Sequence, residues 1–254
     1  MQRRNLLSEI TLEHGPTDAI AQLIALAEEQ IAQRGVSLAF AGFDELVRVN
    51  EANRETWLPL IPTFDPRIAR LGSNNAFCIL GRNAKGEVVV TQAARYWDLG
   101  ASNLHEYFSS LRIYYDNPDQ EKGPGERCEI TVEEAKAITG RVVFLGAVWY
   151  RPDYRGLETP RFLNRIARTY AHSLWATDYS TATVAEAVMK TRLRQMAGYT
   201  KFGWSIDLHD NPMLGSGKYA LCWMDNFEML NDLLAFNAAD HSQVDRRIEG
   251  RGTQ

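Results

Sequence analysis

The segment from residue 141 to residue 176 constrains the fold more than any other part of this sequence. Residues 141–150 are apolar and rich in β-branched side chains, which is typical of a buried strand. A short polar loop follows, and an amphipathic run from Pro160 to Ala176 then indicates a helix, with proline at a position where its missing N–H is not needed. Such a loop directs backbone N–H groups and the helix dipole at one point, which suits a phosphate. The pattern alone is equally typical of an ordinary connection without a ligand.

Two short motifs favour the first interpretation. The loop reads Arg-Pro-Asp-Tyr-Arg-Gly from Arg151 to Gly156, and Tyr-Thr-Lys-Phe-Gly-Trp runs from Tyr199 to Trp204. The first resembles the start of the coenzyme A loop of the GNAT acyltransferase superfamily, and the second resembles that family's late Tyr-x-Lys-x-Gly-Phe motif. The resemblance extends over residues 35–226. It implies an α/β (α+β) fold with a mixed, mostly antiparallel twisted sheet, flanked by helices and splayed beside strand 141–150.

The loop differs from the family pattern at two positions. The family's glycine pair falls here on Glu158 and Pro160. Pro160 removes one backbone donor and biases Thr159 towards extended geometry. The carboxylate of Glu158 would repel a pyrophosphate, and we expect the arginines of the loop to offset that charge. The difference affects how tightly coenzyme A would bind and leaves the fold prediction unchanged.

The resemblance also implies roles for particular residues. In the family, backbone groups of the strand before the loop bind the pantetheine arm, and the corresponding residues here are Val148, Trp149 and Tyr150. The residues that would face the pyrophosphate are Arg155, Gly156, Leu157, Thr159 and Arg161. Tyr199 matches the tyrosine that often protonates the leaving thiolate, which suits a group protonated at neutral pH; the alternative is a tyrosine packed on a helix face. The implied co-substrate is acetyl-CoA or another acyl-CoA.

No general base stands out in the sequence. Glu129, Glu186 and His105 are candidates by location, each also explained as a surface or ion-paired residue, and the proton can instead leave through water. We expect no metal site, because the five histidines show no ligand spacing with cysteine or carboxylate. The cluster of aspartates around His209 is best interpreted as a solvated loop.

Composition limits the remaining function classes. The 254 residues suffice for one large domain or two small ones. A net charge of −4 without a basic block predicts no nucleic-acid partner. No apolar run is long enough for a signal peptide or a membrane span, so we expect a cytoplasmic protein without a membrane partner. The odd number of cysteines, three, favours reduced thiols over a disulfide framework.

Periodicity and turn signals predict the order of elements. Helices are expected at residues 17–33, 43–60, 104–114, 160–176, 190–202 and 227–238. Strands are expected at residues 36–41, 76–82, 87–99, 128–132, 141–150, 180–188, 205–208 and 218–224. We therefore divide the chain into an N-terminal helical extension (1–34), a GNAT-like domain (35–239) and a flexible tail (240–254). Residues 100–140 form an insertion between the third and fourth strands, predicted to lie outside the shared sheet and to cover one side of the cleft.

The resemblance implies an acyl-CoA-dependent N-acyltransferase that acts on a small-molecule, amino-acid or peptide-like amine acceptor. Two alternatives remain open at this point. One is a GNAT-shaped module that has lost catalysis and binds a ligand or partner, and the other is an N-acyl synthase that uses an acyl carrier protein as donor. The apolar stripe of helix 17–33 is expected to pack on its own domain, and packing on a second copy in a homodimer is the alternative.

Overall fold

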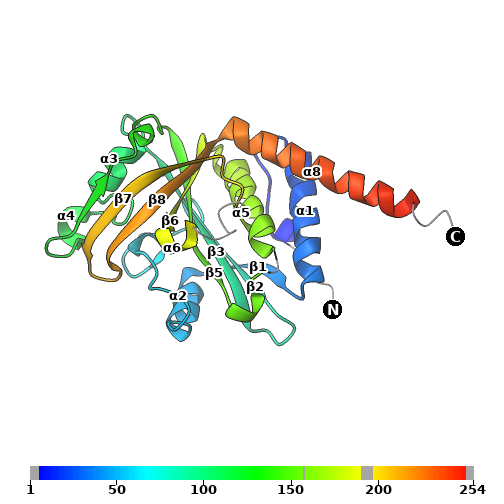
Figure 1. Ribbon diagram of the computed structural model, residues 1–254, viewed down its shortest axis with the longest axis horizontal. Helices are drawn as coiled ribbons and strands as arrows, with labels where there is room; N and C mark the ends of the chain where they lie inside the picture. The colour runs from blue at the N-terminus through cyan, green and yellow to red at the C-terminus, as the bar shows by residue number, and fades with distance from the viewer. Residues whose placement is uncertain (1–5, 157, 190–196, 250–254) are drawn as a thin grey trace.

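Eight strands of the described chain form one mixed sheet (Figure 1). The computed structural model describes residues 6–156, 158–189 and 197–249. Across the sheet the order is β1-β2-β3-β5-β6-β8-β7-β4. The strands are β1 Ser37–Ala41, β2 Ala76–Arg82, β3 Val88–Asp98, β4 Arg127–Ile130, β5 Arg141–Tyr150, β6 Tyr179–Ala185, β7 Lys201–Asn211 and β8 Gly215–Asp225.

One pair of neighbouring strands in this sheet is parallel. Strands β5 and β6 run in the same direction and pair from Val142 to Leu145, opposite Tyr179 to Ala182. The six other pairings are antiparallel. Both strands continue past the last paired residues, so they separate towards their carboxyl ends. The predicted parallel neighbours and the splay beside strand 141–150 are confirmed.

Helices cover both faces of the sheet. The long helices α1 Thr17–Gln33, α5 Thr159–Trp175 and α8 Asn226–Glu249 lie together on one face (Figure 1). The shorter helices are α2 Phe43–Ala52, α3 Leu104–Ser109, α4 Pro118–Glu121 and α6 Glu186–Met189, with 3₁₀ turns at Leu6–Glu9, Pro62–Phe64, Glu133–Lys136 and Pro152–Tyr154. Each face has its own apolar core: one lies under α1 and α5, and the other lies under α2 and the insertion.

Helix α1 has the bounds that its apolar spacing predicts. Residues Ile20, Leu23, Ile24 and Ile31 recur at helical spacing and are completely buried. The buried stripe packs on α5 and α8 of the same chain. The prediction that this helix packs on its own domain is therefore confirmed.

Several predicted boundaries are wrong. Helix α2 ends at Ala52, where residue 60 was expected, because the buried side chain of Asn50 bonds the Leu58 carbonyl (2.8 Å) and the Leu60 N–H (3.3 Å) and so holds a loop. Helix α3 ends at Ser109 because Leu111 has a positive φ of 63°.

The C-terminal third differs from the prediction in two further ways. Residues 190–196 of the predicted helix 190–202 lie outside the described residues, and Lys201 and Phe202 belong to β7 because they pair with β8. Helix α8 continues to Glu249, where a tail from residue 240 was expected; neither glycine nor proline interrupts residues 226–249.

The insertion contributes an edge strand to the sheet. Strand β4 pairs antiparallel with β7, so the prediction that residues 100–140 lie outside the sheet is wrong in this respect. A buried polar cluster fixes the insertion: the Tyr115 hydroxyl and the Asn211 amide both donate to the carboxylate of Glu126, at 2.9 Å and 2.7 Å respectively. Such long-range hydrogen bonding cannot be inferred from local periodicity.

Candidate active site

The site begins where β5 and β6 separate. Strand β5 carries a bulge here, because Thr91 pairs with Trp149 and Ala93 pairs with Gly146, which leaves Ala147 and Val148 opposite a single residue of β3. Ala147 has a φ of 50°, and its carbonyl accepts a 2.6 Å hydrogen bond from the Thr91 hydroxyl. In the described part of the chain no strand pairs with the other edge of this segment. Its edge groups can therefore bind an extended ligand that contains amides.

Gly146 is required just before the bulge. A Cβ atom built on it would lie 2.4 Å from the ring of Phe64, which is completely buried. A larger residue would displace that ring or shift the strand. The close approach thus fixes the position of β5 where it leaves β6.

Two of the three strand residues expected to bind the pantetheine arm are buried, and the third is exposed. The Trp149 ring is stacked on Trp57, with ring centroids 5.4 Å apart, and its Nε1 donates to the Thr56 hydroxyl at 3.3 Å. Tyr150 is buried in the core under α5, whereas Val148 remains 39 % exposed. The side chains of Trp149 and Tyr150 therefore stabilise the strand by packing on residues of the same chain.

The loop after β5 combines a 3₁₀ turn with two positive φ angles. After Pro152–Tyr154, Gly156 has a φ of 83° and Glu158 a φ of 57°, and α5 begins at Thr159. The glycine tolerates this conformation, whereas the glutamate is strained in it. Leu157 lies outside the described residues. Thr159, the first residue of α5, is completely buried.

The arginines of the loop have partners within the protein. Arg155 donates to the Tyr150 carbonyl (3.1 Å) and to the Thr56 carbonyl (3.2 Å), which ties the loop to the segment after α2. Arg151 pairs with Glu87 (2.9 Å) and with Asp153 (2.7 Å). The backbone N–H of Arg161 donates to the Glu158 carbonyl at 2.9 Å, inside the first helical turn.

The partner of Glu158 comes from outside the loop. Its carboxylate lies 3.7 Å from the guanidinium of Arg34, at the end of α1, rather than beside the arginines that the sequence suggested. Arg34 also lies over the Phe162 ring, 5.0 Å from its centroid. Because the pair joins residues far apart in the sequence, sequence analysis missed Arg34.

Tyr199 lies near the point where the strands separate. Its hydroxyl is 3.4 Å from the Ser180 hydroxyl, and Arg168 lies 5.8 Å from its ring centroid. Ser180 is two residues before Ala182, the last residue of β6 that pairs with β5. Burial raises the pKa of Tyr199 far above its ordinary value, and the Ser180 hydrogen bond and the charge of Arg168 oppose this only in part. The phenol therefore remains protonated at neutral pH.

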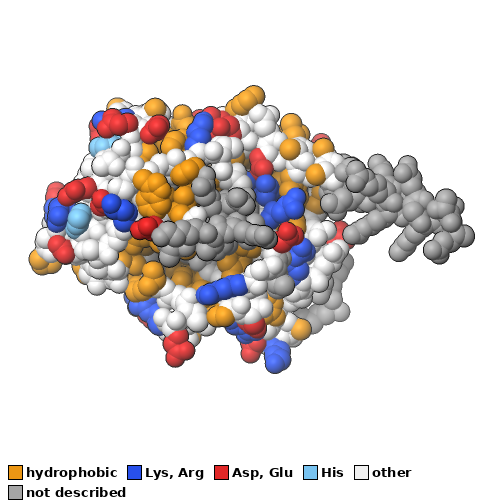
Figure 2. All heavy atoms as spheres, in the orientation of Figure 1, with side chains coloured by type: hydrophobic (Ala, Val, Ile, Leu, Met, Phe, Trp, Pro, Cys, Tyr) orange, Lys and Arg blue, Asp and Glu red, His pale blue; other side chains and the backbone are white. Residues whose placement is uncertain are grey.

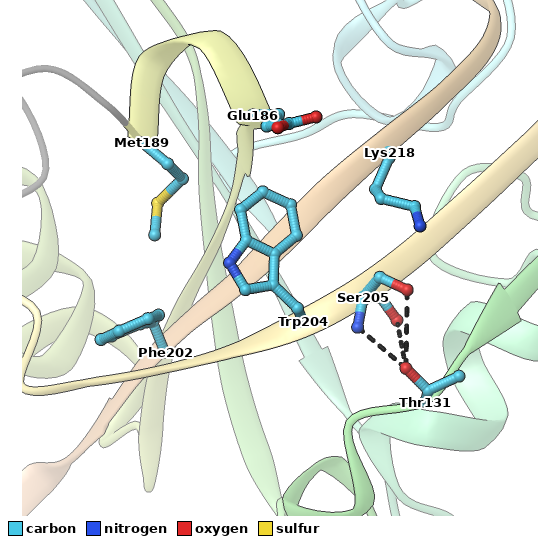
Figure 3. A pocket seen from close by; sticks show the side chains of 7 residues that line it. All are labelled: Thr131, Glu186, Met189, Phe202, Trp204, Ser205 and Lys218. Carbon is cyan, nitrogen blue, oxygen red and sulfur yellow. Dashed lines mark hydrogen bonds between the residues drawn. The ribbon is translucent and has the colours of Figure 1, made fainter.

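A groove of about 670 Å³ adjoins the end of β6 (Figure 3). Trp204 and Phe202 of β7 line it together with Glu186 of α6 and Lys218 of β8; its remaining lining residues are Thr131, Met189 and Ser205. The Thr131 hydroxyl accepts a 2.9 Å hydrogen bond from the Ser205 N–H, which attaches the end of the insertion to β7. The insertion thus contributes Thr131 to one wall.

The three base candidates occupy different places. Glu186 lines the groove. Glu129 pairs with Arg127 at 3.0 Å on the outer edge strand, and His105 bonds the Ile130 carbonyl at 3.2 Å; neither is a lining residue of the groove. The structure therefore brings only Glu186, of these three, to the groove.

The splayed parallel pair decides the fold. The mostly antiparallel sheet opens beside β5, the strand that precedes the loop. The second motif begins at Tyr199, whose hydroxyl contacts Ser180 of β6, the other strand of the parallel pair. This arrangement is the GNAT-like one that the two motifs predicted. Within it, β5 and α5 flank the expected donor loop, and β7 begins inside the second motif.

The comparisons with known proteins concern this fold. No protein-family model matches the sequence, and no curated protein matches it. The chain is similar to a dodecameric spermidine N-acetyltransferase from Vibrio cholerae (TM-score 0.47, 10 % identity, covering 78 % of this chain and 98 % of the other). It is also similar to NAA60 from Arabidopsis thaliana in complex with a bisubstrate analogue (TM-score 0.46, 10 % identity, 75 % and 97 %). We assign no residue of this chain a role on the basis of these two structural similarities.

The described residues contain neither a cluster of metal-ligating side chains nor an exposed cysteine. Within them, no group of three or more histidine, cysteine or acidic residues could hold a metal ion. None of the helices traced in those residues is long and apolar enough to cross a membrane. The three cysteines are buried, and burial raises the pKa of Cys128 to about 12 and that of Cys78 further. Cys78 and Cys128 are therefore poor nucleophiles.

Proposed function

We propose that the protein is an acyl-CoA-dependent N-acyltransferase that transfers an acyl group, acetyl in the simplest case, to the amine of a small-molecule or peptide-like acceptor. The observation that carries the proposal is the unpaired edge of β5 beyond Leu145, which leads directly into the loop and the N-terminus of α5. In parallel pairs, ligands bind outside the carboxyl ends of the strands, and this edge lies there.

Unpaired buried polar atoms on the α5 side of the sheet fit a polar ligand. Both amide atoms of Gln92, the Tyr150 hydroxyl and the Thr159 hydroxyl have no hydrogen-bond partner in the described chain. Gln92 pairs with Ile79, a member of the core under α5, so its side chain lies on that face. Each such atom costs about 1–3 kcal/mol unless a ligand or water supplies a partner.

The proposal gives each part of the loop a role. The backbone of Val148, Trp149 and Tyr150 would hold the pantetheine arm. The N–H groups of Gly156 and Thr159, with the Arg155 side chain, would face the pyrophosphate. Of the other two residues that the resemblance implied, Arg161 already donates its N–H to the Glu158 carbonyl, and Leu157 lies outside the described residues. The bound co-substrate supplies an acyl group activated as a thioester.

Proton transfers complete the proposed mechanism. An acceptor ammonium must first lose one proton, to Glu186 or to water, before its nitrogen can attack the acyl carbon. The N–C bond forms as the C–S bond breaks, and the amine's second proton leaves to solvent. Tyr199 would protonate the departing thiolate and regain a proton from solvent, so that a thiol, an amide and one net proton are released.

Isothermal titration with coenzyme A tests the donor site. Replacing Arg155 with alanine should weaken binding by about 1–3 kcal/mol, because it removes hydrogen bonds from a charged group that shapes the loop. Glu158→Gly should leave binding unchanged or tighten it, since it removes a like charge and relieves a positive φ.

The control is Arg127→Ala, which removes an exposed arginine of β4, in an edge strand outside the loop. It should bind coenzyme A as the unmodified protein does. The absence of measurable binding of coenzyme A or acetyl-CoA to the unmodified protein at millimolar ligand would overturn the enzyme proposal.

A further inference from the structure

The groove beside β6 has an apolar floor that is open to solvent. Trp204 and Phe202 are 39 % and 41 % exposed, and their side chains project from the same face of β7 because they stand two residues apart on the strand. Met189 lies beside them (Figure 3). Figure 2 shows hydrophobic side chains gathered on the left part of this face of the molecule. Large exposed rings in a concave site are typical of ligand-binding surfaces.

Two side chains of opposite charge lie at this floor. Glu186 is the first residue of α6, and Lys218 of β8 pairs with Asp207 of β7. Both project near the indole of Trp204 in the close view (Figure 3). The Lys218 ammonium is 3.6 Å from the Asp207 carboxylate. The lysine side chain is 56 % exposed, so this long ion pair contributes little and the ammonium can turn to a ligand carboxylate.

The groove lies next to the place where β5 and β6 separate. Glu186 follows directly after β6, which forms one side of the splay. An amine held by Glu186 would therefore lie at the carboxyl end of the parallel pair, where the donor site is proposed. A polyamine fits less well, because Lys218 would repel its additional positive charges and, among the described residues that line the groove, Glu186 alone carries a carboxylate.

We infer that the groove binds a small zwitterion with an aromatic or large apolar group, of the kind represented by an aromatic amino acid. The ring would stack on Trp204, the ammonium would face Glu186 and the carboxylate would face Lys218. That this zwitterion is the acyl acceptor rests on the proposed function, whereas its binding in the groove is independent of that function.

Isothermal titration without any acyl donor tests the inference, using L-phenylalanine, 2-phenylethylamine, 3-phenylpropionate and spermidine as probes. Phenylalanine should show saturable binding with a Kd of about 1 mM or below, so that tenfold weaker probes stay measurable. The amine without a carboxylate and the acid without an amine should each bind about tenfold more weakly, which corresponds to the loss of one charged contact. Equal or tighter binding of spermidine would contradict the inference, as would the absence of phenylalanine binding at 10 mM, roughly the weakest affinity such titrations resolve.

Substitutions locate the binding in the groove. Trp204→Ala should weaken phenylalanine binding about tenfold or abolish it, whereas Phe227→Ala, which removes a ring that is 71 % exposed at the start of α8, should not change it. Unchanged affinity in Trp204→Ala would overturn the inference.

Charge-specific variants give a second check. Glu186→Gln should weaken binding of phenylalanine and leave the already weak binding of phenylpropionate unchanged. Lys218→Met should weaken phenylalanine and leave phenylethylamine unchanged. Equal effects of each variant on all probes would contradict the assigned contacts.

The two proposals fail in different ways. Phenylalanine binding in the groove without acyl transfer to any amine would reject the proposed function and keep the inference. Acyl transfer to other amines without phenylalanine binding would do the reverse.

Discussion

Replacing Asp232 with alanine is expected to lower the free energy of unfolding by about 3–5 kcal/mol, because it leaves a buried guanidinium without its counter-charge. The side chain of Arg168 on α5 is completely buried and donates to Asp232 on α8. Arg165 donates to the same carboxylate at 2.7 Å. Burial alone would raise the pKa of Asp232, but Arg168 and Arg165 outweigh it and lower the pKa, so the carboxylate is charged at neutral pH.

Urea denaturation compares this variant with two others. Glu133→Ala removes an acid that is 72 % exposed and paired with Lys136, and it should change stability by less than about 1 kcal/mol. Adding Arg168→Met to Asp232→Ala should restore part of the loss, because the completely buried guanidinium is then removed together with its counter-charge. If Asp232→Ala were no less stable than Glu133→Ala, this cluster would not fasten α8 to α5.

Replacing Tyr199 with phenylalanine is expected to lower kcat for acyl transfer by about 10²–10⁴-fold, the usual contribution of a general acid. The variant removes the protonated phenol beside Ser180 and leaves the ring under Arg168. Coenzyme A binding should be unchanged, because the proposed donor contacts come from β5 and the loop.

The matched control is Tyr179→Phe. Tyr179 lies next to Ser180 on β6 and packs against the opposite core, so it should keep its kcat. Steady-state kinetics and titration of both variants separate the roles. A kcat for Tyr199→Phe equal to that of the control would remove Tyr199 as the proton donor, and a parallel loss of binding would indicate a packing role.

Local patterns predicted those parts of the fold that local sequence determines. Strands β2 and β5 and helix α1 have the predicted bounds. In each, the apolar residues that mark the element in the sequence are also the residues that it buries, so the pattern and the element end together. Helix α2 and strand β7 were misjudged, because Asn50 and the pairing with β8 fix their ends through contacts that are distant in the sequence.

The candidate site shows the same division. The loop motif placed the residues around Gly156 correctly between β5 and α5, since it belongs to one continuous segment. The bulge at Ala147, the pairing of Glu158 with Arg34 and the groove around Trp204 were not predicted. Each of these features depends on contacts between two or more elements. The spacing of residues within a single element does not indicate such contacts.

Amide hydrogen exchange with and without acetyl-CoA tests the central claim most directly, namely that the open edge of β5 and the start of α5 form the donor site. Ligand bound there would occupy backbone groups of residues 146–161, so peptides that cover this segment should exchange more slowly. Peptides from the antiparallel pair β1–β2, at the far edge of the sheet, should exchange unchanged. Exchange that is unaltered over residues 146–161 at saturating acetyl-CoA, or slowed only elsewhere, would contradict the account.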